Sequence, residues 1–235
     1  MNEGNYVTVN LFSLREQSVL LKGLLRLKYC AVAVCLGREP PSNLQKLVGR
    51  MEFCRMWAKA QRGETFFATA ENHNCLTGEY YLGLRDEVVK EQVCRFLVEE
   101  VYAYSPKAMG KYMHGLARLN REKASLICLA PLDKATFQPD LILIRCKPEQ
   151  AMLLLWSYAY NTGEVVRGET GTAMCQTLVV KPILQNKLTF SIGDPGGTYN
   201  VGLSSQELMV SLPYSLLKNM ISTLQRHIKD WKAET

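Results

Sequence analysis

The spacing of apolar and polar residues divides the first third of the chain into short helices and strands. Ser13 and Glu16 have the pattern of a capping box, which predicts a helix that continues, with leucines on one face, to about Lys28. Residues 30–35 are a run of small apolar residues and predict a buried strand. The other elements predicted in this region are a helix over 42–63, strands over 65–69 and 78–84, and a polar loop over 71–75.

The rest of the chain shows the same alternation after a helical region. Residues 86–120 are predicted to be helical, with a break at Ser105 and Pro106. A very apolar helix is predicted from Pro148 to Tyr160, and Gly163 closes it. The other predicted elements are strands over 125–131, 140–146, 187–192 and 207–212, a short helix around Cys175, a tight turn over 193–197 and a C-terminal helix over 213–231.

A short internal echo relates two parts of the chain. Residues 78–84 and 197–203 both read Gly-x-Tyr-x-x-Gly-Leu and are identical at four of seven positions. Cys54 and Cys175 lie 29 and 27 residues before the second glycine of their respective motifs. Each interval is predicted to contain a helix that carries the cysteine, a strand and a polar turn. This shared order of elements around a repeated motif favours a duplicated half-domain.

The predicted fold is therefore α+β, with residues 1–235 forming a single domain. Two halves, at about 30–84 and 140–212, are expected to be related by a pseudo-twofold axis and to contribute to a mixed β-sheet packed with helices. The helical segment 86–120 is expected to be inserted between the halves, and the helix over 213–231 to complete the domain.

The duplication creates a candidate metal site. Cys54 and Cys175 become equivalent residues on inward helix faces, and counting back eight residues from the second glycine of each motif pairs Cys75 with Asp194. Zinc and iron–sulfur clusters prefer thiolate ligands, and a weak fourth ligand leaves a coordination position open. His73, two residues before Cys75, adds a further ligand or a residue that orients one. We predict that the three sulfurs share one pocket, within about 7 Å of each other, with Asp194 or His73 at its rim.

The same residues allow other interpretations. Inward-facing cysteines on helices commonly do no more than pack, and Asp194 in its Asp-Pro-Gly-Gly context is ordinary turn chemistry. The Gly-rich turn 193–197, with Arg55 and His73, also fits a site for a small anion. Cys75 with a histidine base would be a thiol nucleophile. The motifs of zinc proteases, α/β-hydrolases and dinucleotide-binding folds do not occur in the sequence.

Composition and charge narrow the class of protein. The 235 residues are 47% hydrophobic and 21% charged, which is typical of a globular protein. The net charge is +6, but the cations are scattered rather than gathered into a stripe with aromatic residues, so we expect no nucleic-acid partner. No apolar run reaches the roughly 18 residues of a membrane helix, and the N-terminus lacks a signal-peptide pattern. We expect no membrane partner and a cytoplasmic protein, in which the eight cysteines are reduced or bind metal.

Six segments of the chain carry a resemblance to a known family. They follow the family's order and cover most of the sequence: 53–63, 69–78, 82–84, 129–140, 148–152 and 207–213. On these segments the chain resembles the uncharacterised family named domain of unknown function 169, which is found in anaerobic archaea and bacteria. The resemblance implies cysteines at the positions of Cys54, Cys75 and Cys175. It also implies, in many members, a further cysteine where this chain has the turn 193–197. An anaerobic habitat suits an oxygen-sensitive centre, but no activity follows from the resemblance.

These observations predict a cytoplasmic protein with a metal–thiolate site, in its favoured form an iron–sulfur cluster held by Cys54, Cys75 and Cys175. An open coordination position would suit Lewis-acid or sulfur-transfer chemistry on a small molecule. The alternative is a non-catalytic module that binds a small molecule or anion between the halves. The sequence indicates no particular reaction, substrate, protein partner or oligomeric state.

Overall fold

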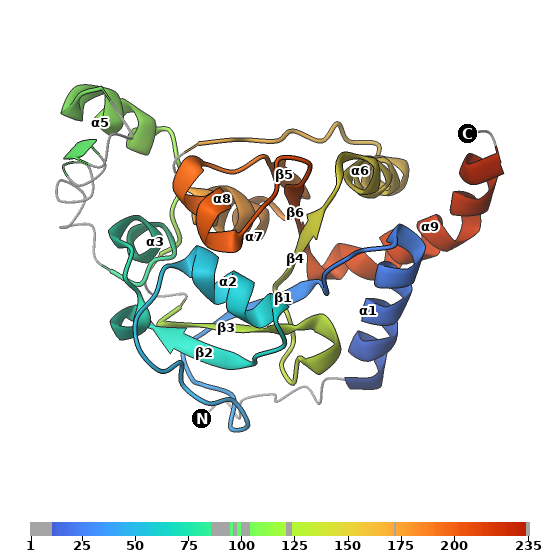
Figure 1. Ribbon diagram of the computed structural model, residues 1–235, viewed down its shortest axis with the longest axis horizontal. Coiled ribbons are helices and arrows are strands. Elements are labelled where there is room, and N and C mark those ends of the chain that lie inside the picture. The colour runs from blue at the N-terminus through green and yellow to red at the C-terminus, as the bar shows by residue number, and fades with distance from the viewer. Residues whose placement is uncertain are drawn as a thin grey trace, which may run out of the picture.

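The computed structural model describes residues 11–85, 95, 98–99, 104–120, 124–171 and 173–233 (Figure 1). They form an α+β domain around one six-stranded sheet, which confirms the predicted fold class. The order of the strands across the sheet is β2-β3-β1-β4-β6-β5, and each strand overlaps a segment predicted to be one. The strands are β1 (Val32–Gly37), β2 (Phe66–Thr69), β3 (Leu126–Pro131), β4 (Leu141–Cys146), β5 (Thr189–Ser191) and β6 (Leu208–Pro213).

Every pairing between these six strands is antiparallel, whereas the sequence predicted a mixed sheet. The connections explain the difference. β1 and β2 run in the same direction, as strands joined through a helix do, but β3 lies between them and pairs antiparallel with both. β6 lies between β4 and β5 in the same way. Among the described residues, parallel pairing occurs at the isolated bridges Lys46–Phe67 and Met51–His73.

Helices cover both faces of the sheet (Figure 1). One face packs against α1, α6 and α9, and the other against α2, α3, a π-helical turn and α8. Neighbouring residues of a strand face opposite layers, so Leu143 of β4 belongs to the second core and Ile144 to the first. The helices are α1 (Leu11–Leu25), α2 (Phe53–Gln61), α3 (Leu76–Tyr81), α5 (Pro106–His114), α6 (Pro148–Thr162), the π-helical turn (Gln176–Val180), α7 (Lys181–Gln185), α8 (Pro195–Val201) and α9 (Tyr214–Ala233). Short 3-10 turns cover Ala70–Asn72 and Leu132–Lys134.

The two halves of the chain repeat one order of elements. β1, α2, β2, α3 and β3 are followed by β4, the π-helical turn with α7, β5, α8 and β6, with α5 added after α3 and α6 added after β4. In each half the first strand is central, the second lies at an edge, and the third lies between them. The first half therefore ends with β3, which follows the segment 86–120. The duplication and the pseudo-twofold relation between the halves stay predictions.

The predicted helix over 42–63 is shorter than expected, because α2 begins only at Phe53. The preceding residues form extended pairings with other segments instead. The N–H of Leu47 donates to the carbonyl oxygen of Phe67 at 2.8 Å, and Gly49 has a φ of +83°, which interrupts any helix. The apolar spacing from Leu44 to Met51 therefore reflects burial of a loop, and Cys54 lies in the first turn of α2 rather than near the middle of a long helix.

The two echo segments lie in the helices α3 and α8, so the prediction of a strand over 78–84 is wrong. Each helix begins at a side-chain cap and is followed by a glycine, Gly83 or Gly202, with a φ of +72°. The predicted tight turn over 193–197 is the start of α8. Tyrosine is common in strands, and both motifs contain it. In α8 the stronger signal is a capping residue followed by Pro195 at the first helical position.

The segment 86–120 is only partly covered by the structure. α5 is helical as predicted, and Oγ of Ser105 caps it by accepting the N–H of Ala108 at 3.2 Å. After α5 the chain returns to α3, where the N–H of Leu119 donates to the carbonyl oxygen of Tyr81 at 2.9 Å. The remainder of this predicted helical segment, with Cys94, lies outside the described residues. In the part that is described, no helix combines the length and apolar character needed to cross a membrane.

Both edge strands of the sheet are paired on their outer side by loops. Phe67 of β2 donates its N–H to the carbonyl oxygen of Gln45 at 3.0 Å and accepts the N–H of Leu47 at 2.8 Å. At the opposite edge, the carbonyl oxygen of Phe190 in β5 accepts the N–H of Glu169 at 3.1 Å. The loop that covers β2 continues directly toward the candidate site.

Candidate functional site

A pair of extended segments brings the first two candidate cysteines to one place. Met51 accepts the N–H of Asn74 at 3.1 Å and donates its own N–H to Asn72 at 2.9 Å. Nε of Arg50 donates to the carbonyl oxygen of His73 at 3.0 Å, which fixes the same turn. Since α2 begins just after Met51 and α3 just after Cys75, these bonds bring the starts of the two helices together.

The N-termini of α3 and α8 are capped by the two residues that the echo pairs. Sγ of Cys75 accepts the N–H of Gly78 at 3.3 Å, and Oδ1 of Asp194 accepts the N–H of Gly197 at 2.7 Å. Burial raises the pKa of the Asp194 carboxyl, while the backbone of Met174, the residue before Cys175, lowers it. Asp194 therefore lies beside the segment that carries the third candidate cysteine.

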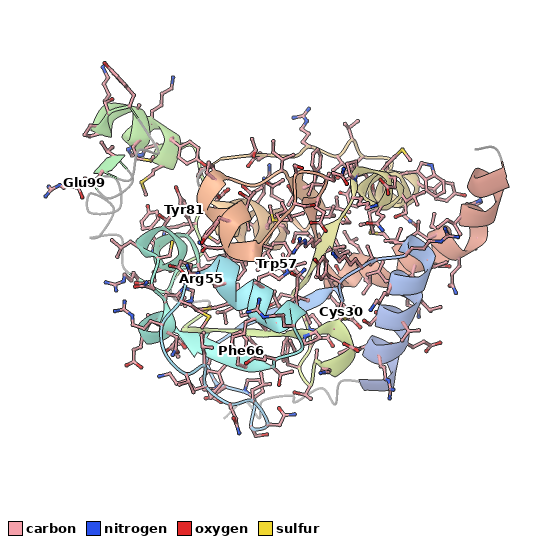
Figure 2. The ribbon with its side chains drawn as sticks, viewed as in Figure 1. Cys30, Arg55, Trp57, Phe66, Tyr81 and Glu99 are labelled. Atoms are coloured by element: carbon pink, nitrogen blue, oxygen red, sulfur yellow. The ribbon has the colours of Figure 1, made fainter. Side chains whose placement is uncertain are left out.

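Packing between α2 and α8 closes the cluster across the two halves. Nε of Arg55 on α2 donates to Oδ1 of Asn200 on α8 at 2.9 Å (Figure 2). Cys175 is buried and directly precedes the π-helical turn, a distortion that is frequent at functional sites. Cys54 and Cys75 are partly buried. The structure thus brings Cys54, Cys75, Cys175 and Asp194 together from four separate segments.

The electrostatics of the thiols show that they affect each other. Burial raises the pKa of the Cys54 thiol well above its usual value, and the charges of Cys175, Asp194 and Cys75 raise it further. Burial likewise raises the pKa of Cys175, with Cys75 and Asp194 adding to the effect. A charged group that raises the pKa of a buried thiol in this way lies close to that thiol. All three thiols are therefore protonated at neutral pH in the metal-free protein, which disfavours Cys75 as a free thiolate nucleophile.

The side chain of His73 is fully buried, with an exposed fraction of 0%. Within the part of the chain that the structure describes, neither Nδ1 nor Nε2 of its ring has a hydrogen-bond partner. Burial lowers the pKa of His73 to about 4, so the imidazole is neutral at pH 7. A Cβ atom at Gly78 would lie 3.8 Å from Nδ1 of His73 and 3.7 Å from Sγ of Cys75, so both atoms border the same small space. Buried ring nitrogens are almost always satisfied, and two orphaned ones suggest a missing ligand or water.

The residue types at this junction are ones that a thiophilic metal takes as ligands, although their side chains do not surround a metal position. In the described ranges, no three His, Cys, Asp or Glu side chains are close enough to hold a metal ion without moving. Three thiols, a carboxylate and a neutral imidazole are the ligand types that zinc and iron–sulfur centres take. That these residues ligate a metal stays a prediction.

Other cysteines are separated from this cluster. Cys128 and Cys146 are 1% and 2% exposed and belong to the core beneath α1, α6 and α9. Cys35 lies opposite Cys128 across β1 and β3. The sequence did not single out Glu52, whose carboxylate raises the pKa of both Cys54 and Cys75 and lies 3.2 Å from Nε of Arg55. Its position two residues before Cys54 is the only sequence signal for it.

Comparison with known proteins identifies the family. A family model described as DUF169, uncharacterised ArCR, matches residues 20–223 of the chain. The chain belongs to this family. Among curated proteins, "Uncharacterized protein MJ0308" of Methanocaldococcus jannaschii is 23% identical over 226 residues, which cover 93% of this chain and 96% of the relative. No solved structure matches the chain.

Proposed function

We propose that this protein holds a metal–thiolate centre, in its favoured form an iron–sulfur cluster, through Cys54, Cys75 and Cys175. The observation that supports the proposal is the convergence of these three thiols from separate segments, beside a buried His73 that has no partner. When bound, such a centre supplies Lewis-acid or electron-transfer chemistry. Asp194 and His73 are the side chains placed to complete or adjust the ligand set.

A bound metal ion would change the protonation states of the cluster. Ligation requires thiolates, and a bound cation lowers the pKa of its ligands enough to deprotonate them at neutral pH. In the metal-free protein, burial and the charges of neighbouring groups keep the Cys54 and Cys175 thiols protonated. The carboxylate of Asp194 beside these thiols favours a cation over an anion at this junction.

The alternative, a non-catalytic site for a small molecule or anion at the same junction, has weaker support. Arg55 was the expected anion contact, but its Nε lies against the carboxylate of Glu52 and the side-chain oxygen of Asn200. The carboxylate of Asp194 lies beside the same junction and would repel an anion. A metal-free, correctly folded protein would nevertheless favour this alternative.

Anaerobic purification tests the proposal. We expect wild-type protein to carry iron with acid-labile sulfide, or zinc, in near-stoichiometric amount, with a visible absorption band if the centre is an iron–sulfur cluster. Cys54→Ser, Cys75→Ser and Cys175→Ser should each lower the metal content at least tenfold.

Cys128→Ala is the matched control, because Cys128 is equally a buried cysteine but lies in the other core. It should keep the wild-type metal content. Metal-free wild-type protein that is folded, or equal metal loss in Cys128→Ala, would contradict the metal–thiolate proposal.

A further inference from the structure

A cavity lies at the end of β4, away from the thiol cluster. Its volume is about 630 Å³, which falls within the range of small-molecule sites. Its walls come from the C-terminal end of α1, the start of α6 and one residue of α9. Because its lining includes none of the candidate metal ligands, this cavity is independent of the proposed metal centre.

The charged residues of this cavity leave an excess of positive charge. Four cations line it, Arg26, Lys28, Arg145 and Lys147, against two carboxylates, Glu149 and Glu207. Arg145 is 8% exposed and its Nη2 lies 2.5 Å from Oε2 of Glu207, so these two charges neutralise each other. Nζ of Lys147 lies 4.0 Å from Oε1 of Glu149.

Arg26 and Lys28 complete the wall without a carboxylate partner among the described residues. Both are exposed, and the Lys28 ammonium lies over the face of Tyr29, 5.1 Å from the ring centroid. Two neighbouring cations without counter-charges attract an anion from solution. The cavity therefore has the charge of a site for an anionic group.

The turn that carries Arg26 is held in place by a residue of the opposite wall. Nε2 of Gln150, on α6, donates to the carbonyl oxygens of Leu25 and Arg26, both at 2.9 Å. Arg26 has a φ of +51°, a left-handed conformation that non-glycine residues rarely adopt. A left-handed residue directly after a helix is a common way to end it, and here the N–H of Leu27 donates to the carbonyl oxygen of Lys22 at 3.0 Å to close α1. The backbone of this wall is thus held in place by Gln150, and it presents an arginine at a position where glycine would adopt the same φ more readily.

The remaining lining is aliphatic. Leu24, Leu25, Met152, Leu153 and Ile228 form it, and Met152 is 44% exposed. Among the side chains that the structure describes, the lining contains no aromatic ring on which a nucleobase would stack. A flexible hydrocarbon chain is the ligand body that such a surface accommodates.

We propose that this cavity binds a small organic anion made of a carboxylate head and a hydrocarbon chain. Arg26 and Lys28 hold the head, and the aliphatic lining around Met152 covers the chain. The ligand is a free carboxylate rather than a lipid in a bilayer, because the cavity lies between packed elements of one domain.

Calorimetric titration with octanoate tests the proposal, with octanamide and inorganic phosphate as probes that each lack one half of the ligand. Wild-type protein should bind one octanoate at least tenfold more tightly than either probe. The double variant Arg26→Gln and Lys28→Gln should lose at least tenfold in affinity. Met152→Glu, which places a negative charge at an exposed position of the same lining, should lose a similar factor.

The matched control is the double variant Arg38→Gln and Lys218→Gln, which removes two exposed cations elsewhere. It should bind octanoate as the wild type does. Octanamide binding as tightly as octanoate, unchanged affinity in the Arg26 and Lys28 variant, or equal loss in the control would overturn the proposal. Binding to phosphatidylglycerol vesicles without binding to octanoate would overturn it in favour of a lipid surface. The titration gives its answer whether or not the protein contains metal.

Discussion

Cys75 and Asp194 occupy the same capping position in two matching helices. Sγ of Cys75 accepts the N–H of Gly78 at 3.3 Å, and Oδ1 of Asp194 accepts the N–H of Gly197 at 2.7 Å. Each side chain therefore supports its helix as well as bordering the thiol cluster. Because a carboxylate is a much stronger acceptor than a thiol, the two caps differ in strength.

Substitution of the two caps should separate their structural and metal-binding roles. We expect Asp194→Ala to lower the free energy of unfolding by about 1–2 kcal/mol, as loss of a strong N-cap does. Cys75→Ala should cost less than about 0.5 kcal/mol in the metal-free protein, because it removes only a weak acceptor. Urea unfolding with a chelator present measures both. A larger loss for Cys75→Ala than for Asp194→Ala would contradict this ranking.

Substitution of His73 by leucine should raise the stability of the metal-free protein and lower its capacity to bind metal. His73→Leu removes two buried ring nitrogens that have no partner, so the metal-free protein should become about 1 kcal/mol more stable. The same change should lower metal content if His73 is a ligand or orients one. Thermal unfolding and elemental analysis of the same preparations measure the two effects. His73→Asn keeps a buried polar group and serves as the control that should gain no stability.

The two motif glycines should differ sharply when replaced by alanine. Both have a φ of +72°, but a Cβ at Gly83 would lie 2.6 Å from the carbonyl oxygen of Leu119, whereas none of the described atoms lies within 4 Å at Gly202. Gly202→Ala should therefore cost only the conformational penalty, about 1 kcal/mol. Gly83→Ala adds a backbone clash and should cost at least about 3 kcal/mol. Equal losses in urea unfolding would show that the chain after α5 does not pack on α3 as the structure has it.

Protonation of Glu207 should lower the stability of the protein in acid. Burial alone would raise its pKa, but hydrogen bonds from Arg145 and Ser204 outweigh burial and lower the pKa from 4.5 to about 2. Because the folded pKa lies below the unfolded one, the stabilisation is complete above about pH 5 and is lost as the pH falls toward 2.

Glu207→Gln should therefore cost about 3 kcal/mol at pH 7, since it leaves Arg145 buried without its counter-charge. The difference from wild type should shrink as the pH approaches 2. Glu149→Gln, at an exposed glutamate nearby, is the control and should leave the pH dependence unchanged. A constant difference between Glu207→Gln and wild type from pH 7 to pH 2 would contradict the ion pair.

Much of the fold followed from local patterns, because buried strands have short apolar runs with clear ends. All six strands and the helix α6 with its terminal Gly163 lie where the sequence predicts them. The errors arose where tertiary pairing or capping outweighs local preference. The loop before α2 has apolar residues at helical spacing because it packs against β2, and no single-segment pattern reports that pairing.

The equivalence of Cys75 and Asp194 could be predicted from the sequence because it depends on a repeat, and both residues cap matching helices. The pairing of Cys75 with Asp194 required only that the two motifs be equivalent, and it did not matter whether they were helices or strands. In contrast, Glu52 and the cavity beside Arg26 depend on the side-by-side packing of distant segments. The left-handed conformation of Arg26 has no sequence signature, since glycine or asparagine is the usual residue there.

The loop that covers β2 protects the molecule from association with other sheets. Exposed edge strands recruit strands from neighbouring chains, and pairing of Phe67 with Gln45 and Leu47 removes that opportunity at one edge. The same loop continues to Arg50 and Met51, which hold the turn around His73. Oxidative or mutational damage that releases this loop would therefore expose the edge strand β2 and separate the residues of the thiol cluster. Aggregation and loss of the cluster should then occur together.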